Sequence, residues 1–169
     1  MLAYLFVVLA VVARFVSIPV SYAPVGAALL FFGARGPRKQ GWIPVVLLAG
    51  ADLLLTKFVY AYPYTLDHVV TIAFYAAVMM LGTLLREKSS PARIGGAAVA
   101  LSVGFFVVSN FAVWLVWNMY PHTLGGLATC YAAALPFYRN QAISELVGTA
   151  VMFSIPALLE LMKPQTAKA

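Results

Sequence analysis

Residues 109–138 read SNFAVWLVWNMYPHTLGGLATCYAAALPFY and join two apolar segments through an aromatic stretch that contains glycine and proline. The stretch leaves the first segment through Asn110, Trp114 and Trp117. A simple membrane anchor needs no such stretch. A protein that holds a small molecule near one face of a bilayer does, because its site needs stacking surfaces and a few hydrogen-bonding groups sheltered from lipid. We therefore expect residues 109–138 to form part of a ligand site on a helical membrane protein.

The composition of the chain indicates an integral membrane protein. Hydrophobic residues make up 63% of the 169 and charged residues only 9%, whereas a soluble domain has about a quarter of its residues charged. The mean hydropathy is +0.93, and the length suits one domain of about five to seven spans. The net charge of +6 comes from small basic clusters between apolar runs, which favours lipid headgroups over nucleic acid as partners. The single cysteine, Cys130, excludes an intrachain disulfide and an all-cysteine metal site.

Hydropathy predicts an all-α integral membrane protein with about six transmembrane helices. The second helix is too short to cross about 30 Å of hydrocarbon, and the fifth is long enough to tilt or protrude. The first is expected to be a retained span and not a cleaved signal, because no basic region precedes it. A structured outer connection is expected between the fifth and sixth helices. The predicted spans are residues 2–20, 24–34, 42–60, 68–85, 94–118 and 141–162.

The positions of the basic residues predict the orientation of these spans. Basic clusters follow the second and fourth spans, at residues 35–39 and 86–93, and two lysines follow the sixth. The opposite connections hold only Lys57 and Arg139. The positive-inside rule then places both termini in the cytoplasm, provided that the second span crosses. The predicted outward connections are residues 17–23, 61–67 and 119–140.

Aromatic residues crowd these outward connections. An interfacial aromatic belt, which most membrane proteins have, is one explanation. The inward connections carry few aromatic residues beyond Trp42, and this one-sidedness favours a site that opens outward. The outward aromatic residues are Tyr22, Tyr60, Tyr62, Tyr64, Tyr120, Tyr131, Phe137 and Tyr138.

Three ionisable residues lie inside the predicted spans, where each costs at least about 2.5 kcal/mol at the centre of a helix and therefore needs a partner. Arg14 and Asp52 lie at similar depths, so we expect an ion pair that joins the first and third spans. The pair is either a structural clamp or a ligand anchor. Glu145 lies near the outer end of the sixth span, where it could pair with Lys57, contact headgroups or bind a ligand amine, in that order of preference.

The fifth span carries two patterns of interest. Asn110, Trp114 and Trp117 follow i, i+4, i+7 spacing and share one stripe. Asn110 lies deeper and must hydrogen-bond within the protein or to a ligand, whereas Trp117 suits an aromatic belt. A small-residue series on the same span is expected to pack within the bundle: Gly96, Ala100 and Gly104.

The chemistry-bearing residues favour neither a metal site nor an enzyme. Asp67, His68, His122 and Cys130 offer suitable ligand types, but they lack a short paired spacing such as His-x-x-x-His. No Ser-His-Asp ordering, phosphate-binding glycine loop or pair of carboxylates stands out. We therefore expect no catalytic residue, no metal and no cofactor. A membrane enzyme that uses Glu145 or His122 as acid or base is a weaker alternative.

Several segments along nearly the whole chain carry a resemblance: Arg14 with residues 23–27, 30–33, 52–55, 109–114, 119–123 and 126–137. Together they resemble an uncharacterised bacterial family of small six-span proteins thought to act in transport. That family is itself similar to the substrate-binding S components of energy-coupling factor (ECF) vitamin transporters.

The resemblance implies a six-helix bundle in the bacterial cytoplasmic membrane that captures a vitamin-like or cofactor-precursor molecule from the outer side. S components work with a membrane T component and two ATPase subunits. This chain carries no ATPase motif, so such partners would supply the energy. Many S components dock through Ala-x-x-x-Ala in the first helix, whereas this chain has Ala10 and Ala13, one residue short. A solitary transporter or a different partner therefore stays open.

Two functions are consistent with these patterns. One is S-component-like uptake of an unknown small molecule, and the other is a non-transporting structural or accessory subunit of a larger membrane complex. For the first, the expected substrate-binding residues are Asn110, Trp114, Tyr120, Tyr131 and Phe137 as the wall of the site, Arg14 and Asp52 as its anchor or support, and Glu145.

Overall fold

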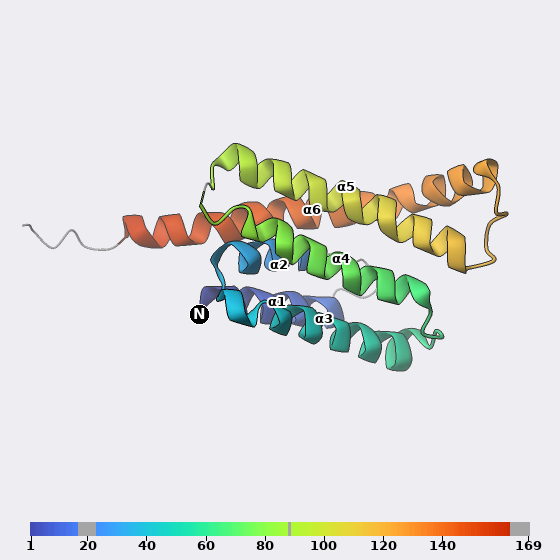
Figure 1. Cartoon of the computed structure of the whole chain (residues 1–169), viewed down its shortest axis with the longest axis horizontal. Helices are drawn as coiled ribbons and strands as arrows, with labels where there is room; N and C mark the ends of the chain where they lie inside the picture. Colours follow the sequence, from blue (N-terminus) through green and yellow to red (C-terminus); the bar gives the residue numbers. More distant parts are fainter. Residues whose placement is uncertain (17–22, 88, 163–169) are drawn as a thin grey trace, which may run out of the picture.

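The structure is a computed structural model, and it describes residues 1–16, 23–87 and 89–162. Within these ranges the chain forms helices and no strand, and the helices run roughly along one long axis (Figure 1). Some predicted features lie outside the described residues: residues 17–20 of the first predicted span, Tyr22 in the first outward connection and the last two lysines. The elements are α1 (Leu2–Val16), α2 (Val25–Arg35), the 3₁₀ turn η1 (Arg38–Gln40), α3 (Trp42–Leu54), its π-helical continuation η2 (Leu55–Tyr60), α4 (Leu66–Thr83), α5 (Pro91–Val116) and α6 (Leu124–Leu161).

The bundle has two chemically different ends. At the basic end, connection 36–41 joins α2 to α3 and connection 84–90 joins α4 to α5. At the aromatic end, connection 61–65 joins η2 to α4 and connection 117–123 joins α5 to α6. The chain begins at the basic end, and α6 also ends there (Figure 1). Residue 1 and the end of α6 thus lie at the same end of the bundle (Figure 1).

Four helical segments in the described part of the chain are long and apolar enough to cross a membrane: Arg38–Tyr60, Leu66–Thr83, Pro91–Val116 and Leu124–Leu161. Together with the composition, they indicate a membrane protein. The other two helices are shorter: α1 is about 22 Å long and α2 about 16 Å at 1.5 Å per residue. The length of α2 falls short of about 30 Å of hydrocarbon, so the expected short second helix is confirmed; the described part of α1 also spans less than this thickness.

The short helix α2 forms the centre of the bundle. Every residue from Val25 to Ala34 is buried, and α2 contacts α1, α3, α4, α5 and α6. Phe31 packs edge-on against Phe6 of α1 and Phe153 of α6, with ring centres 4.9 and 5.1 Å apart. A helix that is apolar on all sides suits this enclosed position.

Two glycines let α2 and α4 meet backbone to backbone. A Cβ atom added to Gly33 would strike the main-chain oxygen of Met79 and lie 2.8 Å from Cα of Gly82. A Cβ atom added to Gly82 would likewise strike the main-chain oxygen of Leu30. Since main-chain atoms cannot rotate away, only glycine at both positions permits this approach.

The predicted boundary of the last helix is wrong. α6 begins at Leu124 and not at residue 141, so most of the expected outer connection 119–140 is helical. Thr123 caps the helix, and its Oγ1 accepts a hydrogen bond of 3.2 Å from the Gly126 amide. Pro136 suggests a helix boundary in the sequence, but it lies inside α6. Membrane helices tolerate interior proline because neighbouring groups satisfy the freed backbone atoms.

The small-residue series of α5 does not pack within the bundle as expected. Gly96 and Ala100 are exposed, and a Cβ atom on Gly96 would meet nothing within 4 Å. Only Gly104 faces a neighbour, the Phe74 ring, at 3.4 Å from its added Cβ. On α1, by contrast, Ala10 is buried in the core. Of the two alanines compared with the docking motif of S components, Ala10 and Ala13, the first therefore lies inside the bundle.

Candidate functional site

Three side chains from α1, α3 and α4 meet inside the bundle. The Arg14 guanidinium forms an ion pair with the Asp52 carboxylate and donates a hydrogen bond of 2.6 Å to the Tyr75 hydroxyl. The expected pair of Arg14 and Asp52 is therefore present, and Tyr75 is a third member that the sequence analysis did not identify. We call Arg14, Asp52 and Tyr75 the charged cluster.

The charged cluster leaves one acceptor unused. Oδ1 of Asp52 faces Arg14, whereas Oδ2 is buried and has no hydrogen-bond partner in the described part of the chain. A buried carboxylate oxygen without a donor is costly. The pair is not sealed completely, since 21% of the Arg14 side chain and 12% of the Asp52 side chain are exposed. The cluster can therefore accept a further hydrogen bond from a group that enters the bundle.

A line of polar groups leads from the charged cluster to the aromatic end. Thr56 follows Asp52 by one helical turn, and its Oγ1 lies 3.1 Å from Nε2 of His68 on α4. Nδ1 of the same ring accepts a hydrogen bond of 3.3 Å from the Thr65 amide. Tyr64 stacks on this ring with centres 4.4 Å apart. The imidazole thus fills the space between connection 61–65 and the buried hydroxyl of Thr56.

The backbone beside this polar line is irregular. α3 continues as the π-helix η2, a form that is rare and frequent at functional sites. η2 ends at Ala61, which has a positive φ of 55°, a left-handed conformation that costs about 1–2 kcal/mol for a residue other than glycine. Together η2 and connection 61–65 border a hollow of about 720 Å³, a size that suits a small molecule. It is lined by Leu53, Leu54, Thr56, Lys57, Phe58, Ala61, Tyr62, Pro63 and Tyr64.

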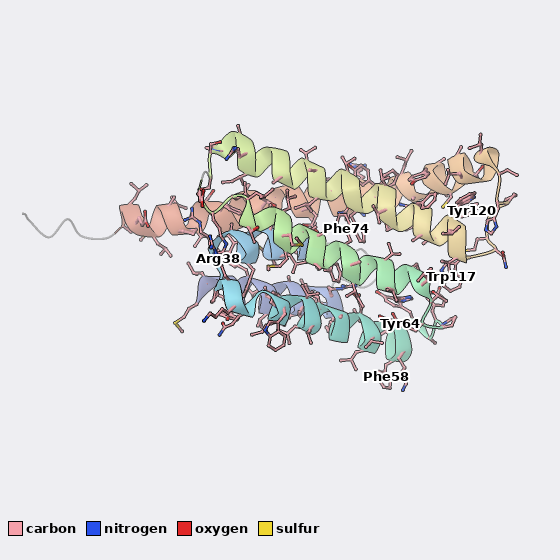
Figure 2. The ribbon with its side chains drawn as sticks, in the orientation of Figure 1. Arg38, Phe58, Tyr64, Phe74, Trp117 and Tyr120 are labelled. Atoms are coloured by element: carbon pink, nitrogen blue, oxygen red, sulfur yellow. The ribbon has the colours of Figure 1, made fainter. Side chains whose placement is uncertain are left out.

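The two connections at the aromatic end touch through aromatic rings. Tyr62 lies edge-on to Trp117, with ring centres 6.2 Å apart, and stacks near Tyr60 at 6.4 Å. Figure 2 labels Tyr64, Trp117 and Tyr120 toward this end and Arg38 near the other. Trp117, which the sequence analysis assigns to an aromatic belt, therefore links connection 117–123 to connection 61–65.

The polar groups of Asn110 and Trp114 bind the protein itself. The indole N–H of Trp114 donates a hydrogen bond of 3.0 Å to the main-chain oxygen of Pro121, and its ring lies 5.3 Å from that of His122. The Asn110 side-chain amide donates a hydrogen bond of 2.8 Å to the main-chain oxygen of Phe106 in the same helix. Trp114 therefore holds connection 117–123 in place.

The other three expected wall residues do not converge. The Tyr131 hydroxyl donates a hydrogen bond of 2.7 Å to the main-chain oxygen of Val107, Tyr120 is half-buried in connection 117–123, and Phe137 is 69% exposed. Tyr131 borders a second, almost wholly apolar hollow of about 290 Å³ between α4 and α5. Its other lining residues are Leu66, Val70, Val107, Val108, Phe111, Ala112, Leu115 and Val116.

Glu145 has a partner that the sequence analysis did not consider. Its carboxylate oxygens accept hydrogen bonds of 2.9 and 2.6 Å from the amides of Gly26 and Ala27, at the start of α2. The negative charge thus meets the positive end of the helix dipole and satisfies two amides that have no partner within the helix. The preferred expectation of a pair with Lys57 is wrong, since the Lys57 ammonium lies over the Phe58 ring, 5.4 Å from its centre. Glu145 ties α6 to the centre of the bundle.

Helical spacing offers a signal for the members of the site that were missed. Thr56 lies four residues after Asp52, and His68 lies seven residues before Tyr75, so each pair shares one face of its helix. The spacing alone does not say which helices face each other, and for that reason the polar line is visible only in the packed bundle.

Within the described ranges, no three histidine, cysteine, aspartate or glutamate side chains lie close enough to hold a metal ion. The charged cluster contains an arginine and a tyrosine beside its one carboxylate. Its chemistry is that of hydrogen bonding and charge pairing.

Residues 1–167 match the profile of a family described as a family of unknown function (DUF6580), and the chain belongs to this family. No curated protein and no solved structure matches the chain. The family description names no activity, so the likeness to S components rests on the sequence motifs alone.

Proposed function

We propose that this member of a family of unknown function takes up a small molecule across the bacterial cytoplasmic membrane, in the manner of an S component. The ligand is a vitamin-like or cofactor-precursor molecule captured from the outer side. The observation that carries the proposal is the charged cluster, in which one carboxylate oxygen of Asp52 has no hydrogen-bond partner among the described residues. The hollow beside η2 is bordered by Thr56, which also belongs to the polar line. The hollow and the polar line lie on the same side of the charged cluster.

A purely structural clamp explains these features less well. A clamp is most stable when every buried polar atom has a partner, because each orphaned acceptor costs about 1–3 kcal/mol. Asp52, whose Oδ2 has no partner within the described ranges, lies one turn from Thr56, a residue that borders the hollow. Binding sites commonly retain strained or unsatisfied groups that a ligand then satisfies.

The proposed arrangement is a compact, S-component-like bundle with the basic end in the cytoplasm. In this orientation the aromatic end faces outward, as the positive-inside rule requires. A ligand would enter at connection 61–65, stack against Tyr62 or Tyr64, and reach Asp52 with a hydrogen-bond donor. Asn110, Trp114 and Tyr131 would support the outer wall, because their polar groups bind the backbone.

Release to the cytoplasm requires a further movement. α2 fills the centre of the bundle and contacts α4 backbone to backbone, and we propose that these two helices close the path toward the basic end. A tilt of the bundle or a separation of these helices would open it. We propose that a T component with ATPase subunits supplies the energy, since the chain has no ATPase motif.

The proposal is tested by purifying the full chain in mild detergent and identifying co-purified small molecules by mass spectrometry. The identified compound is then titrated onto ligand-free protein. Asp52→Asn should weaken its binding at least tenfold, because the amide loses the charge and one acceptor. The matched control is Glu160→Gln, which removes a carboxylate from an exposed position of α6 and should leave the affinity unchanged.

Two outcomes would contradict the proposal. One is that no compound co-purifies and that a panel of vitamins and precursors does not shift the thermal unfolding midpoint. The other is that a compound binds but Asp52→Asn and Glu160→Gln retain equal affinity. In the second case the protein binds the compound at a site other than the charged cluster.

A second candidate function is a non-transporting accessory subunit, and one specific observation favours it. Gly96 and Ala100 form an exposed small-residue face on α5, which another membrane helix could approach closely. In this case Gly96→Leu should disrupt a complex that survives affinity purification in mild detergent, while Asp52→Asn should leave it intact. Recovery of ATPase subunits in that complex would favour uptake instead.

A further inference from the structure

Arginines bind the two connections at the basic end to each other. Arg86 donates a hydrogen bond of 2.8 Å to the main-chain oxygen of Gly36. In the reverse direction, Arg35 donates one of 3.2 Å to the Ser89 hydroxyl. Both partners are uncharged, so these bonds tie the two connections together without neutralising either guanidinium group.

A third guanidinium adds to this positive charge. Arg38 is exposed in connection 36–41. Burial lowers the pKa of Arg86, and the nearby charge of Arg38 lowers it further. The Nε atom of Arg86 is buried and has no hydrogen-bond partner in the described part of the chain. A bound anion would offset the repulsion between these positive charges.

No carboxylate of the described residues forms an ion pair with any of these three arginines. Glu87 follows Arg86 directly but is exposed and lies beyond salt-bridge distance of all three. The counter-ion is therefore expected to come from outside the described chain. Guanidinium groups bind phosphate oxygens particularly well, because their planar N–H donors match the spacing of those oxygens.

We propose that Arg35, Arg38 and Arg86 form a binding site for the phosphate group of an anionic phospholipid, which holds connections 36–41 and 84–90 together. The position fits a lipid headgroup, since α3 begins and α4 ends at this level. Trp42, the first residue of α3, is 63% exposed, and tryptophan favours the headgroup zone of a bilayer.

The test uses the full chain in mild detergent and native mass spectrometry. Phosphatidylglycerol is titrated against phosphatidylcholine, which carries a phosphate but no net charge. Phosphatidylglycerol should bind at least tenfold more tightly, and Arg38→Gln should weaken it about fivefold, the effect of one basic residue near an anionic headgroup. Arg38 is the informative position because its guanidinium has no hydrogen-bond partner among the described residues, so its replacement leaves the fold intact.

The matched control is Arg139→Gln, an exposed arginine on α6 away from the three arginines, which should not alter phosphatidylglycerol binding. Equal binding of the two lipids, or equal effects of Arg38→Gln and Arg139→Gln, would overturn the proposal. Excess inorganic phosphate is added in a separate titration. If it displaces the lipid completely, the site binds free phosphate and the assignment to a phospholipid is wrong.

Discussion

The two halves of the bundle differ in how tightly their helices are packed. Toward the basic end, α2 is buried on all sides and meets α4 backbone to backbone at Gly33 and Gly82. Toward the aromatic end, α3 becomes a π-helix, Ala61 takes a left-handed conformation and a hollow of about 720 Å³ opens beside them. The first half is closely packed, and the second has the irregular backbone that is common at binding sites.

The charged cluster lies where the two halves meet. Arg14 lies near the end of α1, a helix that does not extend through the aromatic half at its described length. The partners of Arg14 come from α3 and α4, which do continue toward the aromatic end. A ligand at the cluster would thus contact the irregular half while resting on the rigid one.

The largest effect on the free energy of unfolding is expected when only one member of the ion pair of Arg14 and Asp52 is replaced. Arg14→Met should lower the free energy of unfolding by about 3 kcal/mol, because it leaves Asp52 charged and without its partner in an apolar bundle. Unfolding in mixed micelles measures this change. The double variant Arg14→Met with Asp52→Leu should recover most of the loss, since no charge then remains unpaired. A double variant as unstable as the sum of the two single variants would show that the pair is not coupled.

The tight packing of the basic half is tested by glycine substitution. Gly33→Ala should lower the free energy of unfolding by about 2.5 kcal/mol, because the added methyl group strikes the backbone of α4. Gly50→Ala is the matched control, since its Cβ would meet nothing within 4 Å. The same thermal or denaturant assay applies to both. Equal stability of the two variants would contradict the close contact of α2 and α4.

Glu145 links α6 to the start of α2, and this link should contribute less to the free energy of unfolding. Glu145→Ala leaves the amides of Gly26 and Ala27 without an acceptor, and this should cost about 2 kcal/mol of unfolding free energy. Glu145→Gln retains one carbonyl acceptor and should cost less. Glu160→Ala, at an exposed position of the same helix, should stay within about 0.5 kcal/mol of the natural protein. An effect of Glu160→Ala as large as that of Glu145→Ala would argue against the cap.

The smallest effect is expected in connection 117–123. Trp114→Phe keeps an aromatic ring but loses the hydrogen bond to Pro121, which should cost about 1 kcal/mol of unfolding free energy. Hydrogen exchange should be faster in connection 117–123 and unchanged in η2. If exchange in η2 rises as much, the two connections are coupled more strongly than the contact of Tyr62 with Trp117 suggests.

The sequence allowed prediction of the helical membrane class, the short second helix and the pair of Arg14 and Asp52, because each depends on composition or depth along a helix. The start of α6 was predicted wrongly, since Pro136 suggests a boundary in the sequence but lies within the helix. The partner of Glu145 could not be inferred. It is the main chain of a helix more than a hundred residues away in sequence, and no side-chain pattern marks such a contact.

Contacts with the main chain also explain why the candidate site differs from the one expected from the sequence. Asn110, Trp114 and Tyr131 have the side chains of a binding wall, yet each donates to a main-chain oxygen. The sequence does not mark Tyr75 as a site residue, because tyrosine is common in apolar spans. Its role depends on Arg14, which comes from another helix. Helix packing therefore leaves Arg14 and Asp52 as the proposed anchor, adds Tyr75 to it, and gives the polar groups of the expected wall to the backbone.

The most direct test of this assignment removes one hydroxyl from each region. Tyr75→Phe and Tyr131→Phe make the same chemical change, the first in the charged cluster and the second at the main-chain oxygen of Val107. The affinity of each variant for the co-purified compound is measured by titration calorimetry. We predict at least a tenfold loss for Tyr75→Phe and no change for Tyr131→Phe. A loss for Tyr131→Phe with full affinity in Tyr75→Phe would contradict the account and return the site to residues 109–138.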